Sequence, residues 1–140
     1  MTLKIKTNIK DLLVKKFILI FAIAALTGCK PSAEKAIELA QKEVSADMKD
    51  PESAKFRYMR FIQQGEKDGV VGGFVCGNVN AKNGYGAYAG YSPFFIAISM
   101  KSKGIFSKGV TYTVDDKKVF SDPSERDMKY YLSTCGQDGI

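Results

Sequence analysis

Three cysteines are the side chains of this sequence best suited to covalent chemistry. Cys29, Cys76 and Cys135 each carry a thiol that can act as a nucleophile, bind a metal, accept a lipid or form a disulfide. The chain of 140 residues contains no histidine, which removes the usual general base, the commonest metal ligand and every Ser-His or Cys-His pair. We therefore expect no metal, no cofactor and no catalytic residue, and we expect the cysteines to serve in anchoring or in a disulfide.

The segment before Cys29 has the features of a bacterial export signal. Five lysines and one aspartate precede residue 17, and residues 17–26 are all apolar. Ten residues of helix rise about 15 Å, which is half of the roughly 30 Å hydrocarbon core of a bilayer. The apolar run is therefore too short to cross a membrane and fits the core of a signal peptide.

The apolar run ends in a four-residue motif, Leu26-Thr27-Gly28-Cys29. This motif resembles the lipobox of bacterial lipoproteins. The resemblance implies that residues 1–28 are removed and that Cys29 receives a diacylglycerol, whose chains suffice to hold a protein on a membrane. Lys30 replaces the aspartate that commonly retains lipoproteins at the inner membrane, which implies the outer membrane, facing the periplasm, if the host is Gram-negative. The alternative is an ordinary signal peptide with an incidental cysteine.

Lipidation of Cys29 would leave Cys76 and Cys135 as a pair in an oxidising compartment. We predict a Cys76–Cys135 disulfide on that basis. The bond would close a loop of about 60 residues and contribute roughly 4 kcal/mol on the chain-entropy estimate. The alternative is two buried free thiols.

Removal of the leader also changes the net charge. The whole chain has 21 basic and 15 acidic side chains, and without the leader 16 and 14 remain, so the net charge falls from +6 to +2. So small a charge gives no reason to expect nucleic-acid binding. We predict a lipidated tether at residues 29–32 and a single domain at 33–140, long enough for one core.

The mature chain predicts an α+β fold with an N-terminal helix, an antiparallel meander of about four strands and a C-terminal helix. Apolar residues recur at helical spacing between residues 33 and 48, with Ser32 as a candidate N-cap. A single turn is expected to begin at Pro51. Alternation and β-branched or aromatic content predict strands at 55–64, 70–80, 93–100 and 110–114, with turns at 65–69 and 115–118. Gly72-Gly73 suggests a bulge or a close backbone approach.

The C-terminal helix is predicted from its capping residues. Asp122 is the expected N-cap, Pro123 the first helical residue and Glu125 the capping-box partner, while Gly136 can end the helix. One face of this helix carries four apolar residues: Met128, Tyr131, Leu132 and Cys135. We expect both helices to pack against one face of the sheet.

The segment from Cys76 to Phe94 is the most specialised in composition. Glycine and alanine alternate with tyrosines there, and asparagines flank them. Glycine and asparagine permit unusual turns, whereas tyrosine is common in recognition surfaces. We consider two interpretations, a binding loop and a turned connection whose tyrosines pack on the sheet. The candidate binding residues are Asn78, Asn80, Lys82, Asn83, Tyr85, Tyr88 and Tyr91.

Two patterns carry a family resemblance. They are Asp50-Pro51-x-Ser53-Ala54-x-Phe56-Arg57 and Cys76-Gly77-x-Val79-Asn80-x-Lys82-Asn83-x-x-Gly86-x-Tyr88-x-Gly90-Tyr91-x-x-Phe94. Together they resemble a family of small bacterial envelope lipoproteins, some of them phage-associated. The resemblance covers roughly residues 50–97 and the late Cys135, and it implies the domain and the disulfide but no activity. Asn78 stands where relatives more often have an acidic residue, which argues against an essential carboxylate there.

These observations predict a non-enzymatic lipoprotein that presents a small disulfide-locked domain to a partner in the envelope, such as a protein or a cell-wall component. Two alternatives are an envelope hydrolase with an unrecognised carboxylate site and a purely structural envelope component.

Overall fold

A computed structural model describes residues 31–104, 107 and 109–137. The predicted signal segment, Cys29 and Lys30 lie outside the described residues. The described chain runs through helix α2 (Ala33–Ala46), the 3₁₀ turn η1 (Pro51–Ser53), four strands and helix α3 (Glu125–Cys135). The strands are β1 (Lys55–Lys67), β2 (Val70–Asn80), β3 (Ser92–Ser102) and β4 (Val110–Val119). They form one antiparallel sheet in the order β1-β2-β3-β4. The predicted α+β fold is confirmed.

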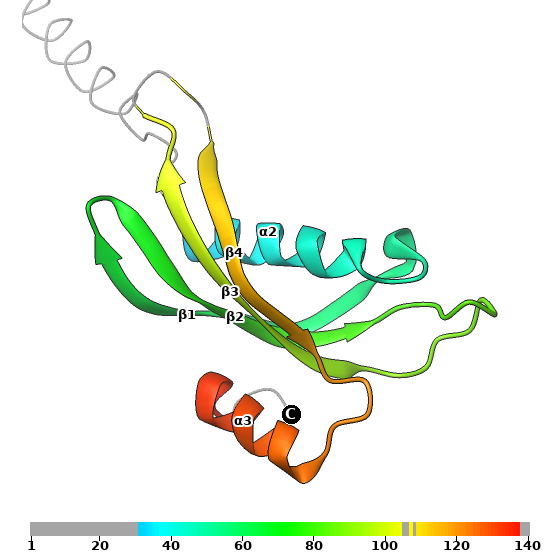
Figure 1. Cartoon of the computed structure of the whole chain (residues 1–140). Helices are drawn as coiled ribbons and strands as arrows, with labels where there is room; N and C mark the ends of the chain where they lie inside the picture. Colours follow the sequence, from blue (N-terminus) through cyan, green and yellow to red (C-terminus); the bar gives the residue numbers. More distant parts are fainter. Residues whose placement is uncertain (1–30, 105–106, 108, 138–140) are drawn as a thin grey trace, which may run out of the picture.

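The two helices cover opposite faces of the sheet (Figure 1). Our expectation that both pack against one face was wrong. Successive residues of a strand point to opposite faces, and the central strands are apolar at both positions. Val75 and Phe94 lie in the core under α2, while Cys76 and Phe95 lie in the core under α3. Each face therefore needs its own cover, and one helix supplies it on each side.

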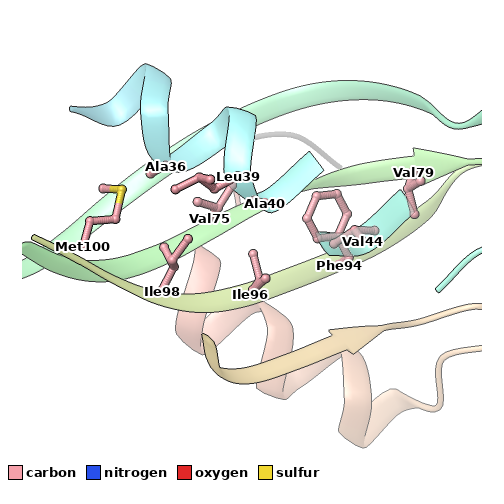
Figure 2. Close-up of a cluster of buried hydrophobic side chains, with 10 residues drawn as sticks. All are labelled: Ala36, Leu39, Ala40, Val44, Val75, Val79, Phe94, Ile96, Ile98 and Met100. Carbon is pink, nitrogen blue, oxygen red and sulfur yellow. The ribbon is translucent and has the colours of Figure 1, made fainter. Parts of the chain in front are cut away.

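The larger core lies between α2 and the sheet. Ser32 begins the helix by accepting a hydrogen bond from the backbone N–H of Lys35 at 3.2 Å, as predicted. The residues of this core follow one stripe of α2 and alternate positions of β2 and β3, as Figure 2 shows. They are Ala36, Leu39, Ala40, Val44, Val75, Val79, Phe94, Ile96, Ile98 and Met100.

The smaller core lies under α3 and contains the disulfide. Cys76 and Cys135 are bonded, as predicted, and are 0% and 3% exposed. The ring of Phe95 contacts the rings of Phe120 and Tyr130, and Phe120 contacts the buried Tyr131 edge to face with 5.8 Å between ring centroids. The disulfide and the ring cluster therefore fix α3 across the sheet.

Arg60 of β1 ties down the end of α3. Its guanidinium donates two hydrogen bonds to the backbone oxygen of Cys135, at 3.2 and 2.5 Å. Gly136 follows with φ +73° and ends the helix, as predicted. At the other end Ser124, not Asp122, is the N-cap, and its capping-box partner is Asp127. The predicted cap was therefore wrong by two residues, and Pro123 lies before the helix rather than in its first turn.

Three strands are longer than predicted: β1 and β4 end later, and β3 extends by one residue at its start and two at its end. The predicted turn at 115–118 is part of β4, which continues to Val119 with an irregularity at Asp115. An ion pair stabilises this extension of β4, because the Lys117 ammonium lies 2.7 Å from the carboxylate of Asp47 at the C-cap of α2. The predicted loop at 65–69 is reduced to the two residues Asp68 and Gly69, whose φ angles of +53° and +73° suit a tight hairpin.

Gly73 marks a close backbone approach, as predicted from the sequence. A Cβ atom at Gly73 would collide with the backbone oxygen of Ile62 and the ring of Phe61. The pairing of β1 with β2 shifts beside it, between Gln63 and Gly65. A side chain at this position would therefore force β1 and β2 apart.

Candidate binding surface

The predicted binding residues divide between strand β2 and the loop that follows it. Asn78 is 5% exposed within β2, and Asn80 is the last residue of that strand. The side-chain oxygen of Asn80 is buried without a hydrogen-bond partner in the described part of the chain. Asn78 is therefore buried within the sheet, whereas Asn80 is partly exposed at the end of its strand.

Asn83 organises the turn of the loop. Its side-chain oxygen accepts hydrogen bonds from the backbone N–H groups of Tyr85 and Ala87, at 3.0 and 3.1 Å. Its backbone oxygen accepts a third from Gly86, which has φ +79°. These hydrogen bonds satisfy backbone groups that have no partner strand in the loop. Asn83 therefore shapes the loop and leaves Tyr85, which is 97% exposed, at its surface.

The base of the loop is fastened to η1. The backbone N–H of Lys82 donates to the Ser53 hydroxyl at 2.8 Å, and the Tyr88 hydroxyl donates to the Ser53 backbone oxygen at 3.1 Å. Lys82 and Tyr88 also form an isolated β-bridge. The ring of Tyr88 is 40% exposed and is held in place by its hydroxyl.

Cationic side chains lie against the tyrosine rings. The Arg57 guanidinium lies 3.9 Å from the ring centroid of Tyr91 and 5.2 Å from that of Tyr58. The Lys55 ammonium lies 4.5 Å from the ring of Tyr88, and that of Lys82 lies 5.9 Å from the same ring. Such distances allow cation–π attraction. We call this group the tyrosine–cation surface; its members are Lys55, Arg57, Tyr58, Lys82, Tyr88 and Tyr91.

The tyrosine–cation surface is unbalanced in charge. Its three cations make no ion pair with a carboxylate in residues 31–104, 107 and 109–137. The lysines that do so, Lys35, Lys117 and Lys118, belong to α2 and β4. The surface therefore combines a positive potential with aromatic rings, a composition that favours a negatively charged ligand.

Half of this surface was missed by the sequence reasoning. Tyr58 is 58% exposed and has φ +54°, at a shift in the β1–β2 register between Arg57 and Arg60. Lys55 and Arg57 are paired across the ladder with Asn80 and Asn78. Their alternate positions on one strand indicate that they share a face of the sheet. Only the register of β1 with β2 shows that this face lies beside the loop.

Two carboxyl groups with a lowered pKa lie in the first turns of the two helices. Hydrogen bonds from the backbone and from Ser32 lower the pKa of Glu34 in the first turn of α2. A hydrogen bond from Lys118, followed by those from Ser124, lowers the pKa of Asp127 to about 2. Asp127 is the capping-box partner of Ser124, and Glu34 lies in the first turn of α2 behind the N-cap Ser32. In the described residues no cluster of three or more cysteine and carboxylate side chains could hold a metal.

Comparison with known proteins leaves the resemblance untested. No protein-family model, no curated protein and no solved structure matches the chain. Among the helices in the described part, none has the length and apolar character needed to span a bilayer. The envelope-lipoprotein family therefore stays a prediction, and the fold rests on the structure alone.

Proposed function

We propose that the protein is a bacterial envelope lipoprotein, attached through a lipid on Cys29, whose domain binds an envelope partner. The cationic leader, the ten-residue apolar run and the motif ending in Cys29 support the anchor. The disulfide between Cys76 and Cys135 is in keeping with an oxidising compartment outside the cytosol.

The observation that carries the binding role is the tyrosine–cation surface. Tyr58, Tyr88 and Tyr91 are 36–58% exposed, beside three cations that have no carboxylate partner in the described chain. Exposed aromatic rings and unpaired arginine are features of recognition surfaces. Hydrogen bonds to Ser53 and within the Asn83 turn hold this region in one conformation, so little ordering is required on binding.

The anchor is tested by feeding cells labelled palmitate. The native protein should incorporate label and sediment with membranes, and a Cys29→Ala variant should do neither. A native protein that stays unlabelled and remains in the soluble fraction would contradict the anchor.

The binding role is tested by photo-crosslinking in living cells. A photoreactive amino acid at Tyr85, on the loop beside the surface, should yield an adduct of higher mass that depends on illumination. The same group at Val114, which is 36% exposed on β4, serves as the control and should not. The adduct should disappear in a Lys55→Gln/Arg57→Gln variant. Equal yields from both positions, or an adduct unaffected by the two substitutions, would refute the proposal.

A further inference from the structure

We infer that the tyrosine–cation surface faces away from the anchoring membrane and binds an anionic glycan, a sugar polymer whose substituents carry carboxylates. This inference rests on the proposed function, because it names the partner of the same surface. Three observations carry it: the position of the surface relative to the anchor, the charge of its cations, and the kind of apolar group it exposes.

The surface and the start of α2 lie at opposite ends of the domain. Figure 2 shows Ala36 near Met100 and Val44 near Phe94 and Val79, so α2 runs along the sheet. The tyrosine loop extends beyond the sheet at the Val79 end (Figure 1). Fourteen residues of helix separate the two ends by roughly 20 Å.

The tether is short in comparison with that separation. Cys29 precedes Ala33 by four residues, which span about 14 Å at most when fully extended. A lipid on Cys29 thus holds the first turn of α2 close to the bilayer. The opposite end of the domain is then directed outward, beyond the headgroups of that bilayer, toward polymers that lie between or outside the membranes.

The cations call for a ligand with regularly placed anionic groups. Lys55 and Arg57 are exposed and alternate on β1, so they share one face about 7 Å apart. Lys82 lies near Lys55, because the ammonium groups of both lysines contact the ring of Tyr88. Charge-assisted hydrogen bonds from ammonium and guanidinium groups to carboxylates are the strong contacts that such a row can make.

The apolar part of the surface favours sugar over a protein partner. In the described residues the exposed large apolar side chains are five tyrosines and Val114. Tyr130 on α3 and Val114 on β4 lie away from this surface. A protein interface is built around a fully buried apolar core. Tyrosine rings that carry a hydroxyl, with no aliphatic side chains beside them, contribute little to such a core. Tyrosine faces instead attract the C–H groups of sugar rings, while a tyrosine hydroxyl can also make polar contacts; at Tyr88 the hydroxyl is bonded to Ser53 and fixes the ring.

The experiment measures binding of the mature lipoprotein, extracted in detergent, to purified peptidoglycan sacculi. Native protein should co-sediment, and Lys55→Gln/Arg57→Gln should weaken binding about tenfold because two charge-assisted contacts are lost. Tyr91→Leu, which keeps apolar volume but removes the ring face, should weaken it about fivefold. The matched control is Lys67→Gln/Lys101→Gln, two exposed lysines on β1 and β3, and it should bind as the native protein does.

Amidation of the carboxylates on the sacculi should abolish binding by native protein. Retention on amidated sacculi, or equal weakening by the control pair, would overturn the inference. Preferential binding to phosphatidylglycerol vesicles would also overturn it. If native protein ignores sacculi while the crosslink from residue 85 persists, the glycan is wrong and the proposed function stands. Absence of both signals would refute the two together.

Discussion

Loss of the Cys76–Cys135 disulfide should cost about 4 kcal/mol of unfolding free energy. The two cysteines are 59 residues apart in the sequence, and closing a loop of that length removes about 4 kcal/mol of chain entropy from the unfolded state. Small domains have total stabilities of about 5–15 kcal/mol. The domain should therefore remain folded in a Cys76→Ala/Cys135→Ala variant, but with much of its stability gone.

Urea titration of the soluble domain, followed by circular dichroism, measures this change. With a dependence of roughly 1.5 kcal/mol per molar urea, the midpoint should fall by about 3 M. Reduction of the native protein separates the chain-entropy effect from the packing lost with the two buried sulfur atoms, and should account for most of the shift. A difference under about 1 kcal/mol would refute the loop-closure reasoning. It would mean that Arg60 and the aromatic cluster hold α3 without the bond.

Three further substitutions test the packing and the caps. Gly73→Ala should destabilise the domain by about 1–3 kcal/mol, because the new Cβ atom would clash with the β1 backbone. The control is Gly72→Ala, where the nearest atom to the new Cβ would be 3.4 Å away, and it should change the stability by less than about 0.5 kcal/mol. Equal effects of the two substitutions in urea titration would contradict the register of β1 with β2. Tyr131→Phe removes a buried hydroxyl that has no well-formed hydrogen bond in the described chain but interacts with the Arg60 guanidinium. Stability should change by less than about 1 kcal/mol in either direction, and a larger loss would show that the hydroxyl is hydrogen-bonded to Arg60. The folded pKa of Asp127 is about 2, below its ordinary 3.8, so protonation favours the unfolded chain. The native protein should therefore melt at a higher temperature than Asp127→Asn, by a margin that is full above pH 5 and vanishes toward pH 2. A pH-independent difference would contradict the pairing of Asp127 with Lys118.

Local signals predicted the elements and the bond between the cysteines. The helix beginning at Ala33 follows from apolar spacing and from Ser32, and the structure confirms both. The disulfide followed from the odd number of cysteines, once one of them was assigned to lipid. Each of these inferences needed only short-range chemistry and a count of residues.

Inferences that needed tertiary context were the ones that failed. Both faces of β2 and β3 are buried, and the unbroken apolar run of β3 was the available signal. The four charged residues at 115–118 were read as a turn because the partner of Lys117, Asp47 at the C-cap of α2, lies far away in the sequence. Edge strands commonly carry such charges.

The candidate surface was half visible from the sequence. The exposure of Tyr85, Tyr88 and Tyr91 fits the predicted recognition loop, and the alternation of glycine and tyrosine drew attention to it. Lys55 and Arg57 escaped notice because they come more than 20 residues earlier. Only the pairing of β1 with β2 brings them to the rings, and the shift that sets that register has no simple sequence signature.

The intact mass of the protein isolated from membranes tests the central claim most directly, because cleavage, acylation and disulfide formation each change it. The account predicts a chain that begins at Cys29, carries acyl chains, and lacks the hydrogens lost when Cys76 joins Cys135. A chain that still begins at Met1, or one that begins at Cys29 without lipid, would contradict it.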